Sequence, residues 1–572
     1  MFSWPHPAVA RELVQRYFDF SAPTYRVLHR PTVIGWLARV QAEDRGEHLG
    51  APPLPAAARA AVLMVFATAS MFKLDMDGAM CDADDDGWRE SEMYYIVAQD
   101  LLSVEDGPQR LESVQARFMT VLYQLSSSRA NQAWFTHGTT VQLIMALGLH
   151  RKRTPTPDTK VSDLVVAECQ KRVLWCSYTV DKYLSVIIGR PRLLQDEDID
   201  QEYPSHVNDE DLSAHSITTR PARDCTMDAP IFHACLARVL ARASKEQYAI
   251  QQLSAQQQID ASLARSKDIA NWHAGLPPFI SGAVQAGTLV PVFRRQLTVL
   301  RLAHYHATMF VTRPLLLRNY AKTLEDSYGL TYRSQLRNCV LAAKDATDLI
   351  LSFVQDGQLF PAFWYSQYIA FNALSIIYIY VIQAVRRRIP SQILSAFEEQ
   401  PFVIDDQTLF RLAESVQDHL AKATIRNAPA WKYSFILEGL RSEITGPDRS
   451  GFGQTLPEVQ YHGGLGRTSV PSLSEPSSAA PSSRIAGSQL AEDSEHLRSS
   501  LAPTYSGMHG TSTFDHVTDT GLPGQKADGE YSHANFFYPE AERLLEGLSG
   551  NMGETEFGFE FWPQFDSLPL CE

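Results

Sequence analysis

The sequence predicts an all-α protein in which one large multi-helix domain is followed by a disordered C-terminal tail. Apolar residues recur with helical spacing from Ala8 to Ile444, with no sustained strand-like alternation and no repeat of fixed period. Hydrophobic residues make up 45% of the chain and aromatic residues 10%, which is enough for a large core. Beyond Gly446 the composition changes to Ser, Pro, Gly and Thr, which cannot bury enough apolar area to offset chain entropy.

These changes in composition divide the 572 residues into three segments. We expect a helical domain over residues 1–444, a disordered Ser/Pro/Gly-rich linker over 445–535, and an acidic-aromatic segment over 536–572. A chain of this length can hold one very large helical domain or two ordinary ones, in addition to a tail.

The first and last expected helices of the domain each carry an apolar set. The set of the first is Val9, Leu13, Tyr17 and Phe20, and that of the last, which ends near Ile444, is Trp431, Phe435, Leu437 and Leu440. Between them, the segment from Tyr368 to Val385 is nearly long enough to span a bilayer. Because Asn372, Ser375 and Gln383 interrupt it, we predict a buried core helix and no membrane span.

The segment from Val165 to Ile187 predicts the central helix of the domain. One apolar stripe with steps of four or three comprises Val165, Cys169, Val173, Cys176, Val180, Leu184 and Ile187. Glu168 and Arg172 lie one turn apart, a pair that stabilises an exposed helix face by about 0.2–0.5 kcal/mol. Gly189 can adopt the left-handed conformation that closes a helix, and Pro191 cannot continue one.

An acidic segment follows this helix. Asp196, Asp198 and Asp200 alternate along the chain, so in an extended segment their carboxylates would project from one side. We predict that Arg190 and Arg192 pair with these carboxylates and attach the acidic loop to the helix. Packing and capping explain each of these residues taken singly, and it is their combination that is specific.

The order of these features from Gly148 to Pro204 resembles the regulatory domain of fungal zinc-cluster transcription factors, the fungal-specific transcription factor domain or middle homology region. The resemblance covers approximately residues 8–444 and is strongest over 118–204. It implies structural or regulatory roles for the matching positions, which are Gly148, Leu149, His150, Arg151, Glu168, Arg172, Trp175, Asp181, Gly189, Arg190, Pro191, Asp196, Asp198, Asp200 and Pro204.

The seven cysteines are scattered, and no C-x-x-C occurs among them. A binuclear zinc cluster needs six thiolates within about thirty residues, because bridging thiolates must reach two metal ions. We therefore expect no metal ligands and no cofactor in this chain, with zinc expected only if an upstream cysteine cluster exists. The chain is then either a natural zinc-less family member that acts through a partner or a gene model that starts too late. Scattered single cysteines also indicate a reducing compartment.

The sequence lacks both the common catalytic motifs and the basic charge that is typical of DNA-binding chains. It contains no His-Glu-x-x-His, no Gly-x-x-x-x-Gly-Lys loop and no Gly-x-Ser-x-Gly elbow, so we expect no catalytic residues and no enzyme. The net charge of −14, from 51 basic and 65 acidic residues, does not favour a chain that binds DNA by itself. Contact with DNA is expected only indirectly or through a missing N-terminal module.

The last segment alternates aromatic residues with acids. Its candidate activation residues are Phe557, Phe559, Phe561, Trp562 and Phe565. Acids keep such hydrophobic residues solvated and available to dock as short amphipathic helices into a coactivator groove. The alternatives are that the segment folds back over a groove of its own domain, or that it is a plain tail.

Three hypotheses about function follow. The leading one is a fungal transcription regulator, by family resemblance one of a metabolic gene cluster, with a nuclear location. Its partners would be the coactivator machinery and, in a homo- or heterodimer, a DNA-binding family member. The second is an interaction protein or inhibitor that binds full-length regulators. The nucleus is the expected location, with the cytoplasm as the alternative. The third is a small-molecule-binding or enzymatic helical protein.

Overall fold

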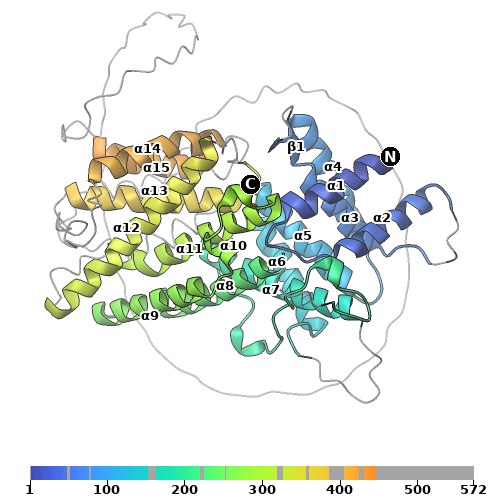
Figure 1. Ribbon diagram of the computed structural model, residues 1–572, viewed down its shortest axis with the longest axis horizontal. Helices are drawn as coiled ribbons and strands as arrows, with labels where there is room; N and C mark the ends of the chain where they lie inside the picture. The colour runs from blue at the N-terminus through green and yellow to red at the C-terminus, as the bar shows by residue number, and fades with distance from the viewer. Residues whose placement is uncertain are drawn as a thin grey trace, which may run out of the picture. The chain divides into compact units, whose positions relative to one another are not determined.

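The structure is a computed structural model that describes residues 2–47, 50, 52–75, 79–152, 163–218, 224–251, 253–317, 326–355, 360–385, 405–423 and 431–445. Within these ranges the chain is almost entirely helical, which confirms the all-α class (Figure 1). The predicted linker after Thr445 and the acidic-aromatic segment 536–572, with all five candidate activation residues, lie outside the described residues.

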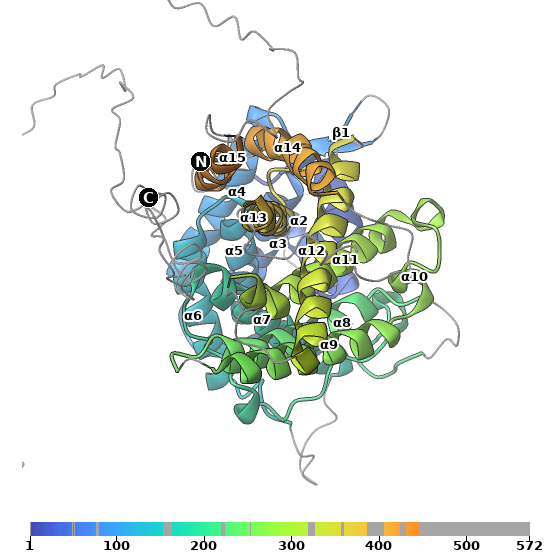
Figure 2. The same cartoon turned by 90° about the vertical axis from the view of Figure 1, so that its left-hand side faces the viewer.

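The helical elements follow the chain in an orderly succession (Figures 1 and 2). Their bounds are α1 Pro7–Arg16, the π-helical turn η1 Tyr17–Ser21, α2 Arg30–Asp44, α3 Ala56–Ala69, α4 Asp85–Ser103, α5 Leu111–Ser126, α6 Ala130–Ala146, α7 Leu164–Ile188, the 3₁₀ turns η2 Asp196–Asp198 and η3 Asp209–Asp211, α8 Asp228–Gln247, α9 Ala255–Ala274, α10 Pro278–Ser281, the 3₁₀ turn η4 Ala286–Thr288, α11 Pro291–Leu317, α12 Asp326–Gln355, α13 Trp364–Val385, α14 Asp406–Ala423 and α15 Trp431–Thr445.

A small hairpin between α3 and α4 was not anticipated from the sequence. Strands β1 (Phe72–Leu74) and β2 (Met80–Asp82) pair antiparallel, with Lys73 opposite Cys81. Each strand has three residues, too few for a recognisable apolar alternation. Asp84, which follows the hairpin, accepts a hydrogen bond from the Gly87 amide at 3.0 Å and caps α4.

Two hydrophobic clusters form the interior. The N-terminal core is built mainly by α1, α3, α4, α5 and the first half of α7, with the alanine-rich α3 packed against α4 and α5. The C-terminal core is built by α8, α9 and α11–α15. Helix α7 contributes to both, since Trp175 belongs to the N-terminal core and Tyr183 to the C-terminal core.

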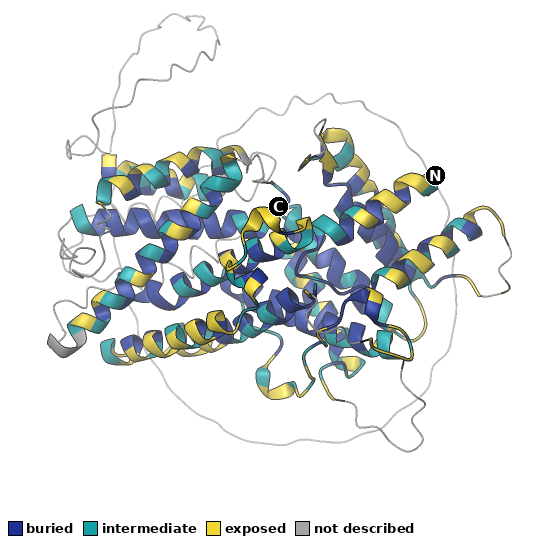
Figure 3. Cartoon of the chain, in the orientation of Figure 1, coloured by how far each residue is buried: buried dark blue, intermediate teal, exposed yellow. Residues whose placement is uncertain are grey.

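Helix α13 lies at the centre of the C-terminal core and packs against α11, α12, α14 and α15. It is the one helix in the described ranges that is long and apolar enough to cross a membrane, and 89% of its most apolar window is buried inside the protein (Figure 3). Two of the polar residues that interrupt it are hydrogen-bonded inside the protein, as Asn372 accepts from Arg313 at 2.9 Å and Gln383 donates to the Leu316 carbonyl at 2.7 Å. The predicted buried core helix is thus confirmed.

Two members of the predicted terminal stripes do not face the core. Val9 on α1 is 43% exposed and Phe435 on α15 is 42% exposed, whereas Leu13 and Leu437 in the same stripes are buried. The prediction was wrong at Val9 and Phe435 because the buried face of each helix is narrower than its apolar set.

Candidate functional site

Helix α7 carries most of the residues that the sequence singled out. Asp163 caps its start by accepting hydrogen bonds from the amides of Val165 at 2.8 Å and Val166 at 3.2 Å. Gly189 closes it with φ of +67°, as predicted, because this conformation is strained for other residues. The predicted stripe is only part of the buried surface, since both cores pack on α7 and nearly all of its residues from Glu168 onward are buried.

After Gly189 the chain turns and runs back along α7, which we call the return loop (residues 190–211). Asp181 lies near the C-terminal end of α7, and its two carboxylate oxygens accept hydrogen bonds from the amides of Leu193 at 2.9 Å and Leu194 at 3.1 Å. One turn earlier on α7, the Tyr178 hydroxyl donates to Asp196 at 2.5 Å.

The contacts continue towards the start of α7. Trp175 donates its indole N–H to the Glu202 carbonyl at 2.8 Å and stacks on Tyr203 with ring centroids 4.2 Å apart. Glu168 accepts from both the amide and the hydroxyl of Ser205, each at 2.8 Å. Because residues three or four apart lie on one face of a helix, α7 holds the return loop along a single face.

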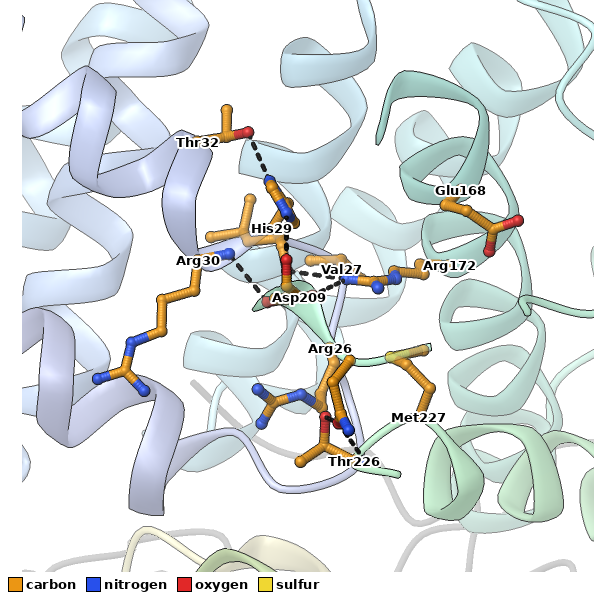
Figure 4. Close-up of polar contacts among 12 residues, drawn as sticks. Arg26, Val27, His29, Arg30, Thr32, Glu168, Arg172, Asp209, Thr226 and Met227 are labelled. Carbon is orange, nitrogen blue, oxygen red and sulfur yellow. Dashed lines mark hydrogen bonds and ion pairs between the residues drawn. The ribbon is translucent and has the colours of Figure 1, made fainter. Parts of the chain in front are cut away.

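The return loop ends at η3, where Arg172 and Asp209 form a buried ion pair (Figure 4). The Arg172 side chain has no solvent exposure, and its Nη1 lies 2.6 Å from Asp209 Oδ1. The other oxygen of Asp209 accepts from the amide of Arg30, the first residue of α2, at 2.9 Å. A negative charge at a helix N-terminus is stabilising, so Asp209 links α7 to the start of α2.

The segment before α2 surrounds this ion pair (Figure 4). A ring nitrogen of His29 lies 3.0 Å from the Asp209 carbonyl, and the other lies 2.8 Å from the Thr32 hydroxyl. Arg26 is buried and donates to the Phe18 carbonyl at 3.0 Å. Three parts of the chain far apart in sequence, namely residues 26–32, α7 and η3, therefore meet at Asp209.

The charges around Asp209 keep it ionised. Burial by itself would raise the pKa of the Asp209 carboxyl, but the charges of Arg172 and Arg26 and the Arg30 amide hold that pKa below its usual range. Burial lowers the pKa of the Arg26 guanidinium, and the Asp209 charge acts against that shift. Asp209 and Arg172 are therefore both charged at neutral pH.

The predicted positions at the end of α6 meet the return loop from the other side. Gly148, with φ of +66°, and Leu149 donate back to the carbonyls of Met145 and Ile144 in a Schellman motif that ends α6. The His150 carbonyl accepts from the Asp200 amide at 3.2 Å, and Arg151 lies 3.2 Å from the Asp200 carboxylate.

Two predicted pairings are wrong. Arg190 donates to Asn131 at 2.9 Å and lies over the Trp134 ring, while Arg192 donates to the Ala241 carbonyl at 2.6 Å; neither pairs with the acidic segment. Asp196–Asp198 is a 3₁₀ turn and not an extended segment, and Asp196, Asp198 and Asp200 do not share a partner. Asp196 binds Tyr178, Asp200 binds the residues after α6, and Asp198 is exposed with no polar side-chain partner in the described part of the chain.

The environment predicted for Glu168 and Arg172 is also wrong. Both side chains are buried, and their nearest polar partners are Ser205 and Asp209, not each other. The two remaining predicted positions differ in burial: Pro191 is exposed in the turn after Gly189, and Pro204 is buried beside α7.

Sequence reasoning missed Asp209 and His29. Asp209 lies in the run Asn208-Asp-Glu-Asp211, which reads as an exposed acidic turn, yet Asp209 and Asp211 are buried. His29 was noted only within the family's opening segment, and no local signal indicates that it reaches a residue 180 positions away.

No group of three or more potential metal ligands gathers in the described ranges. The six cysteines there are free, and burial raises the pKa of both Cys169 and Cys176 to about 12, so these thiols stay protonated and unreactive. The predicted site residues that α7 brings together are joined by hydrogen bonds and ion pairs.

A comparison with protein families finds a match over the residues that form this hydrogen-bond network. Residues 14–274 match the family model described as a fungal specific transcription factor domain. No solved structure matches the chain.

Among curated proteins, a transcriptional regulatory protein of Saccharomyces cerevisiae is 23% identical over 401 residues, covering 66% of this chain and 51% of that protein. Activator of stress genes 1 of the same yeast is 23% identical over 387 residues, covering 66% of this chain and 39% of that protein. Transcriptional activator protein acu-15 of Neurospora crassa is 22% identical over 314 residues, covering 53% and 30%. The chain spans about half the length or less of these relatives.

Proposed function

We propose, from the match of residues 14–274 to the family model described as a fungal specific transcription factor domain, that the protein is a fungal transcription regulator whose helical domain is its regulatory part. The observation that carries the proposal is the family match over the α7 region, where the return loop is held along one helix face. The relatives described above are named as regulators or activators of transcription, and none of those names describes an enzyme.

The regulator would act in the nucleus and would reach DNA through a partner or through a module outside these 572 residues. The net charge of −14 supports this, because a chain that neutralises phosphates by itself normally presents a basic face. Output would come from the acidic-aromatic segment 536–572, which offers aromatic residues to a coactivator groove among solubilising acids.

A reporter assay tests this proposal. The whole chain is fused to an unrelated DNA-binding domain in a fungal host, and reporter output is compared with that of the DNA-binding domain alone. We expect at least about a ten-fold rise in output, which corresponds to about 1.4 kcal/mol of added recruitment. No rise would rule out activation by this chain.

A pair of multiple variants identifies the segment responsible. Alanine at Phe557, Phe559, Phe561, Trp562 and Phe565 should abolish the rise. The matched control places alanine at Ser472, Ser474, Ser477, Ser478 and Ser482 in the linker and should leave output unchanged. Equal output from both variants would place activation outside the aromatic residues.

The second candidate is an interaction protein or inhibitor that binds full-length regulators, whose family model residues 14–274 match. The same fusion distinguishes the two functions. Output below that of the DNA-binding domain alone would support the inhibitor, and the chain expressed without a fusion should then lower transcription driven by a full-length family member.

A further inference from the structure

A pocket lies where the N-terminal and C-terminal cores meet. Its wall comes from η1 and the residues after it, from α3 and α5, from α11, and from residues 362–366 at the start of α13. The space inside, including the mouth, is about 800 Å³. Part of this space is open solvent at the mouth.

Arg295 on α11 is the only basic residue of the pocket wall. Its guanidinium carbon lies 3.8 Å from the ring centroid of Phe363 and 4.7 Å from that of Phe20. Its Nε is shielded from solvent and has no hydrogen-bond partner, although the side chain as a whole keeps some exposure. No described residue forms an ion pair with it.

The buried arginines of the described chain have polar partners, whereas half-buried Arg295 has no ion-pair partner there. Arg172 pairs with Asp209, Arg26 donates to a backbone carbonyl near Asp209, and Arg313 donates to Asn372. Burial lowers the pKa of Arg295 to about 9, and no neighbouring acidic charge opposes that shift. A half-buried cation without a counter-charge among the described residues favours an anion that enters from outside.

The rest of the wall defines the body of the ligand. Phe363 supplies aromatic surface beside Arg295, Trp364 and Tyr17 add aromatic surface elsewhere in the wall, and Ser126 and Thr298 supply hydroxyl groups. Tyr25 also lines the pocket, and its buried hydroxyl has no hydrogen-bond partner. A planar guanidinium is well suited to bind a carboxylate through two parallel hydrogen bonds.

We propose that this pocket binds a small organic monocarboxylate, with the carboxylate on Arg295 and an apolar body against Phe363 and Trp364. Bound there, the ligand would contact both cores at once and stabilise their junction. The proposal concerns binding, so it can be tested whether or not the chain regulates transcription.

One cation in the wall selects one negative charge. The chain's own acidic-aromatic segment is a less suitable occupant, because it carries acids throughout while the pocket offers a single arginine. A small monocarboxylate matches the charge without leaving further acids buried and unpaired.

The test uses the full-length chain and the probe 4-phenylbutyrate, with the neutral 4-phenylbutyramide as its matched control, in isothermal titration calorimetry. We expect the carboxylate to bind with a Kd below about 1 mM and the amide at least about ten-fold more weakly. Absence of heat with the carboxylate at saturating concentration, or equal affinity for the amide, would overturn the proposal.

Two arginine variants of α11 distinguish binding in the pocket from binding to exposed arginines. Arg295→Met should keep the fold and lose at least about ten-fold in carboxylate affinity, whereas Arg301→Met, at an exposed position of α11, should bind as the wild type does. If Arg295→Met does not fold, Ser126→Phe, which fills the pocket without removing Arg295, must show the same loss. Unchanged affinity in either folded variant would contradict the assignment.

A final variant tests the chain's own tail as occupant. The double variant Phe559→Ala/Trp562→Ala in the full-length chain should bind the probe with wild-type affinity. Binding at least about ten-fold tighter would mean that the tail competes for the pocket, and the proposed small-molecule ligand would then be replaced by this segment.

Discussion

Arg172 and Asp209 lie 37 residues apart in the sequence and form a buried ion pair, with Nη1 and Oδ1 2.6 Å apart. The same carboxylate accepts the first amide of α2, so one acidic side chain joins α7, η3 and α2. The pair explains why the return loop ends against α7 instead of continuing into solvent.

Breaking this ion pair should destabilise the protein strongly. Arg172→Met would leave Asp209 buried with its charge only partly compensated, and we expect a loss of about 3–5 kcal/mol in the free energy of unfolding, measured by urea denaturation. Arg89→Met, at an exposed position of α4, is the control and should change stability by no more than about 0.5 kcal/mol.

A double-mutant cycle with Asp209→Leu should show that the two residues act together. The loss in the double variant should be smaller than the sum of the single losses by more than about 1 kcal/mol. Additive losses would mean that the contact contributes little and that the two side chains serve separate purposes.

The return loop should open locally when the hydrogen bonds from the Leu193 and Leu194 amides to Asp181 are weakened. Asp181→Asn takes a charge from the group that accepts the amides of Leu193 and Leu194, so exchange of these two amides with deuterium should accelerate. Asp198→Asn, at an exposed site on the same loop, should leave exchange unchanged. If both variants exchange alike, Asp181 does not hold the loop.

Alanine substitutions at Gly138 and Gly148 should change the stability of the protein in opposite directions. At Gly148 the φ of +66° is strained for alanine, and Gly148→Ala should cost about 1–2 kcal/mol. At Gly138, inside α6, a Cβ meets nothing within 4 Å, and Gly138→Ala should stabilise by about 0.5–1 kcal/mol. Thermal unfolding of both variants would check the opposite signs.

Stability should fall as the pH decreases from about 6.5 to 5 because two buried histidines resist protonation. Burial lowers the pKa of His233 to about 3 and that of His306 to about 3, the latter also because of the nearby Arg313 and His233. Below pH 6.5 the unfolded chain binds protons that the folded chain excludes, so each histidine removes up to about 1.4 kcal/mol per pH unit.

A substitution at His306 isolates the contribution of this residue to the pH dependence of stability. Neither ring nitrogen of His306 has a hydrogen-bond partner, so His306→Phe should fold and reduce the pH slope by up to about 1.4 kcal/mol per pH unit. An unchanged slope in a folded His306→Phe variant would contradict this contribution. The raised pKa values of Asp228, Asp345 and Asp406, each caused first by burial, act in the opposite direction and offset part of the loss at lower pH.

The sequence was sufficient for local features that depend on neighbours along the chain. The helical spacing around Cys169 and Val180, the stop at Gly189 and the buried character of α13 were predictable because backbone geometry and apolar periodicity act over a few residues. The family resemblance likewise rested on the order of such features between Gly148 and Pro204.

The partners of the charged residues were decided by tertiary structure. Arg190 and Arg192 lie close to the acidic segment along the chain, yet Arg190 binds Asn131 beside Trp134, and Arg192 binds a carbonyl of α8. Arg172 finds Asp209 and not Glu168, since packing both cores on α7 buries it and a buried charge must take whichever opposite charge the fold brings to it. Local sequence determines where a helix begins and ends, whereas the partner of a buried charge depends on segments that meet only when the whole chain has packed.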